Sequence, residues 1–181
     1  MAVYISLLRG INVAGQKIIK MADLRALYQQ ISLSNVQSYI QSGNLMFTSN
    51  ESQCSDIAKQ INKAIWAKYQ FEVPIFVLTP EALENARNNL PFNDINLAQD
   101  GSKILLCFLS EVPSNSIELL SPYLKANERM DIIDQVLYLH CEDGFGRSKL
   151  THSQIEKKLN VSATARNLKT VDKLLAMAST Y

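Results

Sequence analysis

The sequence predicts an α+β fold made of two ferredoxin-like βαββαβ units in tandem, each followed by an extra helix. Two observations predict this fold. Apolar residues recur with the period of strands in some segments and with the period of helices in others. These segments follow the order strand, helix, hairpin, helix, strand, helix in each half of the chain. That order is typical of the split βαβ arrangement, in which the fourth strand lies at a sheet edge.

The first half begins with an apolar run that predicts a strand over residues 3–8. Helical spacing follows at Met21, Leu24, Leu27, Tyr28 and Ile31. Alternation around the turn residues 41–44 predicts a hairpin over residues 36–48. Ser52 or Ser55 is expected to cap the next helix. The apolar stripe of that helix consists of Ile57, Ile61, Ala64 and Ile65.

A fourth strand is predicted over residues 73–78. Pro74 places this strand at the sheet edge, because proline has no N–H to donate to a ladder. Thr79 and Pro80 then occupy the cap and first-turn positions that helices favour, which predicts a trailing helix. The apolar residues of that helix are Leu83, Ala86 and Leu90.

The second half repeats this order. Residues 103–109 predict a strand, and a helix carries Ile117, Leu120, Tyr123 and Leu124. A hairpin is predicted over residues 129–140, with its turn at 134–135. Thr151 opens a capping-box pattern before the next helix, and residues 161–166 predict a fourth strand. The last helix carries Val171, Leu174, Leu175 and Ala178.

This reading divides the chain into three parts. Residues 1–91 form the first ferredoxin-like unit with its trailing helix, residues 92–101 form a linker, and residues 102–181 form the second unit with the C-terminal helix. A chain of 181 residues with 47% apolar content can bury cores of this size.

Composition disfavours several classes of protein. The 18 basic and 17 acidic side chains nearly cancel, so non-specific attraction to nucleic acid or to an anionic membrane is not expected. No secretory or membrane-spanning segment is recognisable, which predicts a cytoplasmic protein. The three cysteines are far apart and lack a Cys-x-x-Cys pair, so reduced thiols are expected, with no disulfide framework and no thiolate metal site.

Four polar stretches place charged or amide side chains beside glycines, where a backbone can approach a ligand closely. The predicted ligand-binding residues are Arg9, Asn12, Ser42, Asn44, Arg147, Ser148, Lys149, Arg166 and Asn167. In this topology the first-half residues are expected to meet at one end of their sheet, and the second-half residues at the opposite end of theirs. The sequence therefore predicts one polar cleft between the two halves.

The stretch at residues 144–149 precedes the helix capped by Thr151, so Arg147, Lys149 and the helix N-terminus are candidates for an anion site. The alternative is that both cations pair with carboxylates of the other half and the glycines only form a turn. Arg9 has a similar alternative as a structural ion pair or carbonyl clamp. The amides of Asn12 and Asn44 can equally bond their own turns.

No catalytic residue, metal ligand or cofactor is predicted, and whether the protein is an enzyme stays open. His140 is expected to pack within an apolar strand and His152 to lie at a helix start. Trp66 and Tyr69 follow an apolar stripe, so both are expected at the edge of the core and not on a base-stacking platform.

Five motifs occur in a characteristic order along the chain: LLRGINV at residues 7–13, MADL at 21–24, YIQSGN at 39–44, GRSKL at 146–150 and RNxxTV at 166–171. With these motifs the chain resembles the bacterial family called domain of unknown function 1697 over nearly its whole length. Ala14 and Leu168 depart from the family pattern, which usually has glycine and tryptophan there. The family has no established activity, so the resemblance implies kinship and fold without implying chemistry.

Two functions agree with these observations. The first is a binding module for a phosphate-bearing ligand, a nucleotide or an RNA segment, in the polar cleft; RNA is supported only by analogy with other paired sheets, because no aromatic pattern for stacking bases is present. The alternative is a module for protein interaction or self-assembly, without small ligand or catalysis, that uses exposed sheet edges. The oligomeric state stays open.

Overall fold

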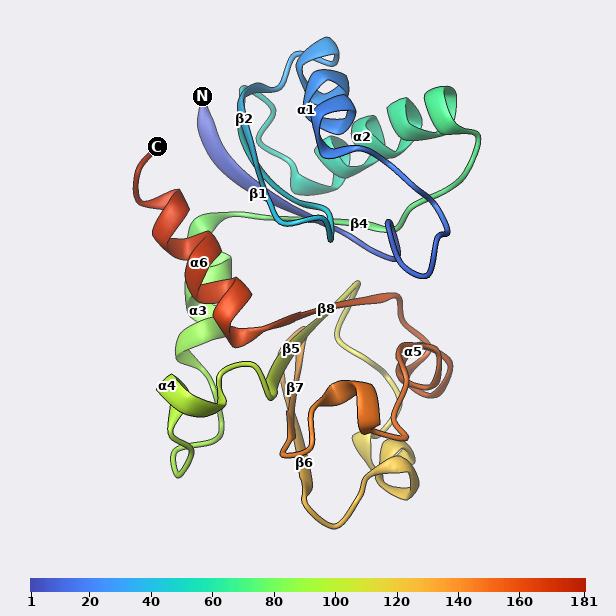
Figure 1. The fold of residues 1–181 in the computed structure, drawn as a ribbon, viewed down its shortest axis with the longest axis vertical. Helices are drawn as coiled ribbons and strands as arrows, with labels where there is room; N and C mark the ends of the chain where they lie inside the picture. The colour runs from blue at the N-terminus through green and yellow to red at the C-terminus, as the bar shows by residue number, and fades with distance from the viewer. The chain divides into compact units, whose positions relative to one another are not determined.

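The computed structural model describes residues 1–181, and Figure 1 shows the course of the chain. The protein has the predicted α+β architecture, with one four-stranded antiparallel sheet in each half. The chain divides into two compact units, Met1–Leu83 with Leu174–Tyr181 and Glu84–Lys173. The boundaries that the sequence predicts at residues 91 and 101 stay a prediction. None of the helices combines the length and the apolar character needed to cross a bilayer.

The first unit contains one ferredoxin-like set of elements. In chain order they are β1 (Ala2–Leu8), α1 (Met21–Gln30), β2 (Ser34–Tyr39), β3 (Asn44–Ser49), α2 (Cys54–Tyr69) and β4 (Ile75–Leu78). The strands lie in the order β2-β3-β1-β4, and α1 and α2 lie on one face of the sheet (Figure 1). The strand β4 pairs only with β1, so it is the edge strand that Pro74, directly before it, predicts.

The core of this unit lies between its sheet and its two helices. Tyr4, Leu8 and Phe47 belong to the same buried cluster as Tyr28 of α1. The rings of Tyr28 and Phe47 meet edge to face, with 5.4 Å between their centroids. The buried hydroxyl of Tyr28 is hydrogen-bonded to Ser6 Oγ at 2.9 Å. The ring therefore packs in the core while its polar atom keeps a hydrogen-bond partner.

The predicted serine cap of α2 is wrong. The helix begins after Gln53, whose side chain makes no capping bond. The carboxylate of Glu51 instead accepts the backbone N–H groups of Ser52 and Gln53, at 2.7 and 2.9 Å. A carboxylate is a stronger acceptor than a hydroxyl and is favoured beside the positive end of a helix. Ser55 lies inside the helix.

The stretch of chain that follows β4 and precedes β5 contains α3 (Pro80–Asn88) and the short α4 (Leu97–Asp100). The helix α3 begins as predicted: the hydroxyl of Thr79 accepts the backbone N–H of Ala82 at 3.2 Å, and Pro80 is the first helical residue.

The second unit contains the second ferredoxin-like set. Its elements are β5 (Ile104–Leu109), η1 (Ile117–Tyr123), β6 (Glu128–Ile133), β7 (Val136–Cys141), η2 (Phe145–Arg147), α5 (His152–Leu159) and β8 (Ala163–Asn167). The last helix, α6 (Leu168–Ala178), begins in this unit, and its residues from Leu174 onward belong to the first unit. The strands lie in the order β6-β7-β5-β8. Asp134 adopts the left-handed conformation (φ 53°) in the hairpin turn, as a two-residue turn requires.

One predicted helix differs from the structure. The segment around Leu120 is a 3₁₀ helix, because Pro122 inside it has no N–H for an α-helical bond. Leu120 still buries its side chain in the cluster between the sheet and α5. The opposite face of the sheet carries Tyr138, whose hydroxyl donates to the carbonyl of Ala86 at 2.7 Å and joins α3 to β7.

Candidate functional site

Asn12 holds the loop after β1 against the hairpin turn of the first unit. Its side-chain amide donates to the carbonyls of Ile19 and Gln41 at 2.9 and 2.8 Å, and its Oδ1 accepts the N–H of Ile19 at 2.8 Å. Asn12 has φ 57°, a left-handed conformation that asparagine tolerates better than most residues. These three hydrogen bonds hold the Asn12 side chain in place between the loop after β1 and the hairpin turn.

Ser42 and Asn44 serve the hairpin turn in the same way. Asn44 is fully buried, and its amide donates to the carbonyl of Tyr39 at 3.2 Å and to Ser42 Oγ at 2.9 Å. Gly43 between them has φ +76°, and a Cβ there would lie 2.7 Å from the Cβ of Leu8. These contacts place both side chains and the glycine within the hairpin turn, and a binding role for Ser42 and Asn44 stays a prediction.

Arg9 completes the predicted residues of the first unit. It is half-buried, and its backbone N–H donates to the carbonyl of Pro74 at 3.0 Å. The bond from Asn12 to Gln41 confirms that the loop after β1 and the hairpin turn meet at one end of the sheet.

Two predicted residues of the second unit, Ser148 and Asn167, make hydrogen bonds that stabilise local structure. Ser148 Oγ donates to the carboxylate of Glu128 at 3.0 Å and accepts the N–H of Leu150 at 3.1 Å. The Oδ1 of Asn167 accepts the N–H of Thr170 at 2.9 Å, at the start of α6. Both side chains are used for capping or for holding a loop.

Arg166 is buried in the second unit. Its Nη1 donates to Thr164 Oγ1 at 3.0 Å and to the carbonyl of Ala165 at 2.8 Å. Burial lowers the pKa of Arg166 to about 10, so the guanidinium keeps its charge at neutral pH.

Arg147 and Lys149 differ from the other predicted residues because both are exposed and neither takes part in an ion pair. They lie before α5, whose capping box forms as predicted: Thr151 Oγ1 accepts the N–H of Gln154 at 3.3 Å, and Gln154 Oε1 accepts the N–H of Thr151 at 2.7 Å. This segment leaves two cations in solvent next to a helix N-terminus.

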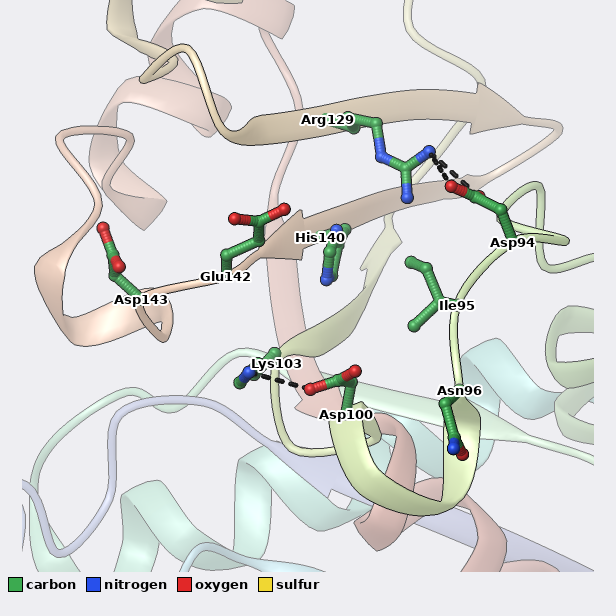
Figure 2. A pocket seen from close by; sticks show the side chains of 9 residues that line it. All are labelled: Asp94, Ile95, Asn96, Asp100, Lys103, Arg129, His140, Glu142 and Asp143. Atoms are coloured by element: carbon green, nitrogen blue, oxygen red, sulfur yellow. Dashed lines mark hydrogen bonds and ion pairs between the residues drawn. The ribbon is translucent and has the colours of Figure 1, made fainter.

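A pocket of about 530 Å³ opens in the second unit (Figure 2). Three separate segments line it: the segment before β5, which includes α4; strand β6; and the end of β7 with the residues after it. The lining residues are Asp94, Ile95, Asn96, Asp100, Lys103, Arg129, His140, Glu142 and Asp143. Sequence reasoning missed this pocket, because no local pattern joins these segments.

Two ion pairs lie at the rim of this His140 pocket. Arg129 Nη1 lies 3.0 and 3.1 Å from the two carboxylate oxygens of Asp94, and Lys103 Nζ lies 2.8 Å from Asp100 Oδ1. The hydrogen bonds from these cations hold the pKa values of both aspartates below their usual range. Figure 2 shows the pairs on either side of His140.

His140 lies on β7, where it pairs in register with Ile104 of β5 and Arg129 of β6. Its side chain is 5% exposed, and its ring lies 6.0 Å from that of Phe92. Packing was expected for this residue, but its Nδ1 is buried without a hydrogen-bond partner and the side chain also lines the pocket. Burial, with a smaller effect of Arg129, lowers the pKa of His140, which keeps the imidazole neutral at pH 7.

Charge in the pocket is unbalanced. Four carboxylates (Asp94, Asp100, Glu142, Asp143) line it against two cations (Lys103, Arg129), which leaves a net charge of −2 with a neutral imidazole. Just outside the lining, Lys125 lies 3.5 Å from Asp143. No three of the protein's His, Cys, Asp and Glu side chains are grouped to hold a metal ion. The pocket therefore favours neither an anion nor a metal centre.

The remaining candidates for reactive chemistry are the cysteines, which are free thiols. Burial raises the pKa of Cys107 to about 12 and that of Cys141 to about 11, so both stay protonated at neutral pH. Burial also raises the pKa of the half-buried Cys54. None of these thiols has the lowered pKa of a nucleophilic cysteine.

The expectation for Trp66 is wrong: its side chain is 48% exposed. The buried stripe of α2 runs through Ile57, Ile61 and Ile65 at four-residue spacing, and the next residue points about 100° away from it. Tyr69 does pack at the edge of the core, as expected.

Comparison with known proteins agrees with the fold. The chain is similar to a solved structure, that of conserved bacterial protein SP0830 from Streptococcus pneumoniae, with a TM-score of 0.67 and 26% sequence identity over 97% of this chain and 98% of that chain. A search of curated proteins found no match. The family described as "Protein of unknown function (DUF1697)" matches residues 1–138, which is most of the sequence. The chain therefore belongs to the DUF1697 family.

Proposed function

We propose that the protein is a binding module for a phosphate-bearing ligand, which Arg147, Lys149 and the first turn of α5 contact. The observation that carries this proposal is that both side chains are exposed without a carboxylate partner. Two nearby cations repel each other, and an anion between them would offset that repulsion. Within the second unit, neither side chain has a carboxylate partner.

The start of α5 supports the same ligand chemistry. The backbone N–H groups of a first helical turn point outward and carry partial positive charge. The capping box of Thr151 and Gln154 holds this turn in place. A phosphate group at this end would add charge-assisted hydrogen bonds to a rigid element. Arg9 in the first unit and Arg166 in the second stay predicted ligand-binding residues.

Calorimetric titration with inorganic phosphate and with ATP tests this proposal. Lys149→Ala should weaken binding by roughly tenfold, because it removes a charge-assisted hydrogen bond. Lys157→Ala is the matched control, since it removes an exposed lysine from the other end of the same helix. Equal weakening in both variants, or no binding by the unaltered protein, would sink the proposal.

Self-association is a second candidate function, favoured by exposed aliphatic side chains in the first unit. Val13, Ile18 and Ile40 are 60, 63 and 52% exposed. Their backbones converge, because the amide of Asn12 bonds the carbonyls of Ile19 and Gln41, next to these residues. Sedimentation equilibrium should then show an oligomer that Ile18→Ser weakens; a monomer at all concentrations would remove this candidate.

A further inference from the structure

We propose that the His140 pocket binds a small ligand carrying a protonated amine. This site is separate from the basic residues of the proposed phosphate contact, and its chemistry is opposite in charge. A pocket of about 530 Å³ is within the range of small-molecule sites, which extends from roughly 300 to 1,000 Å³.

The first argument is the excess of carboxylates over cations. Both cations of the lining are already committed, Arg129 to Asp94 and Lys103 to Asp100, and these pairs hold the rim in a defined geometry. Glu142 takes part in no ion pair, and the amide of Asn127 donates to its Oε2 at 3.5 Å. Its carboxylate is therefore available to an ammonium group of a ligand.

The second argument is His140 itself, which is independent of the carboxylates. Its side chain is more than nine-tenths buried, yet Nδ1 has no partner in the protein. Leaving a buried polar atom unsatisfied is unfavourable, and such atoms in folded proteins are usually explained by a ligand, a water or a function. Figure 2 shows the imidazole among the lining side chains, with Glu142 beside it.

Together the two groups describe the ligand. An ammonium group would bind the carboxylate of Glu142, and a neighbouring nitrogen or hydroxyl of the same ligand would reach the imidazole of His140. The only aliphatic side chain of the lining is Ile95, so the polar groups of the ligand make most of the contacts. Short polyamines have this combination of charge, size and spaced nitrogens.

The test is calorimetric titration with putrescine and spermidine at constant ionic strength. We expect binding to the unaltered protein, and Glu142→Gln should weaken it at least about fivefold, because it removes the charge of the anchoring group. Glu111→Gln is the matched control: it makes the same change at an exposed glutamate of the same unit outside the pocket. The control should bind as the unaltered protein does.

A second readout follows the imidazole directly. Spermidine should shift the ring nitrogen NMR signals of His140, and the shift should saturate with the calorimetric binding curve. Asp143→Asn provides a second exposed variant if Glu142→Gln fails to fold. The proposal is overturned if magnesium chloride at the same ionic strength gives the same effect, if Glu111→Gln weakens binding equally, or if the His140 signals do not move.

Discussion

The side-chain amide of Asn12 donates to the main-chain carbonyl of Gln41 across 29 residues of sequence, at 2.8 Å. This bond joins the loop after β1 to the hairpin turn between β2 and β3. We expect Asn12→Ala to destabilise the protein by about 2–3 kcal/mol, because Ile19 and Gln41 lose their partners and the new residue must keep a left-handed backbone. Urea unfolding would measure the change. Asn88→Ala, at an exposed asparagine, should stay within about 0.5 kcal/mol; an equal loss there would contradict the assignment.

Alanine substitutions at Gly43 and Gly10 would distinguish the cost of backbone strain from the cost of steric overlap. Both have positive φ, but a Cβ at Gly43 would lie 2.7 Å from Leu8 Cβ, whereas nothing lies within 4 Å of one at Gly10. Gly10→Ala should therefore cost about 1 kcal/mol through strain alone, and Gly43→Ala should cost at least about 1 kcal/mol more. Chemical denaturation of both variants decides the matter. Equal losses would show that the overlap is relieved freely.

Substitutions of the neighbouring residues Ser148 and Lys149 should change stability by different amounts. Ser148→Ala removes the hydrogen bond to the buried carboxylate of Glu128 and should cost about 1–2 kcal/mol. Lys149→Ala should change the stability of the ligand-free protein by less than about 0.5 kcal/mol, since this exposed lysine has no partner. A loss of several kcal/mol for Lys149→Ala would identify a structural ion pair and remove the basis of the phosphate proposal.

The lowered pKa of His140 predicts how stability depends on pH. As pH falls through the ordinary range of histidine, near 6.5, the unfolded chain takes up a proton at this position that the folded protein resists. The free energy of unfolding should therefore fall as pH drops from about 7 through the ordinary histidine pKa and below it, and His140→Gln should reduce that fall. Arg129 and Lys103 oppose protonation of the ring, while Glu142 and Asp100 favour it. An unchanged pH dependence in the variant would contradict this prediction.

The sequence by itself determined the local elements and their order. Apolar periodicity predicted the strands and most helices, and local chemistry predicted the cap of Thr79, the turn at Asp134 and the capping box of Thr151. These features depend on residues within a few positions of one another, so a pattern in the chain is enough to predict them. The serine cap of α2 and the α-helix around Leu120 failed at the same local level, because Glu51 is the stronger acceptor and Pro122 cannot donate.

Only the tertiary structure decided what the polar side chains do. The sequence selected Asn12 and Asn44 for their chemistry, but which backbone groups they meet depends on the hairpin and on the loop packed against it. The His140 pocket depends on pairing as well: the register of β7 with β5 and β6 brings Lys103 and Arg129 beside the imidazole. Strand pairing joins residues far apart in the chain, and the periodicity of one segment holds no information about the partner beside it.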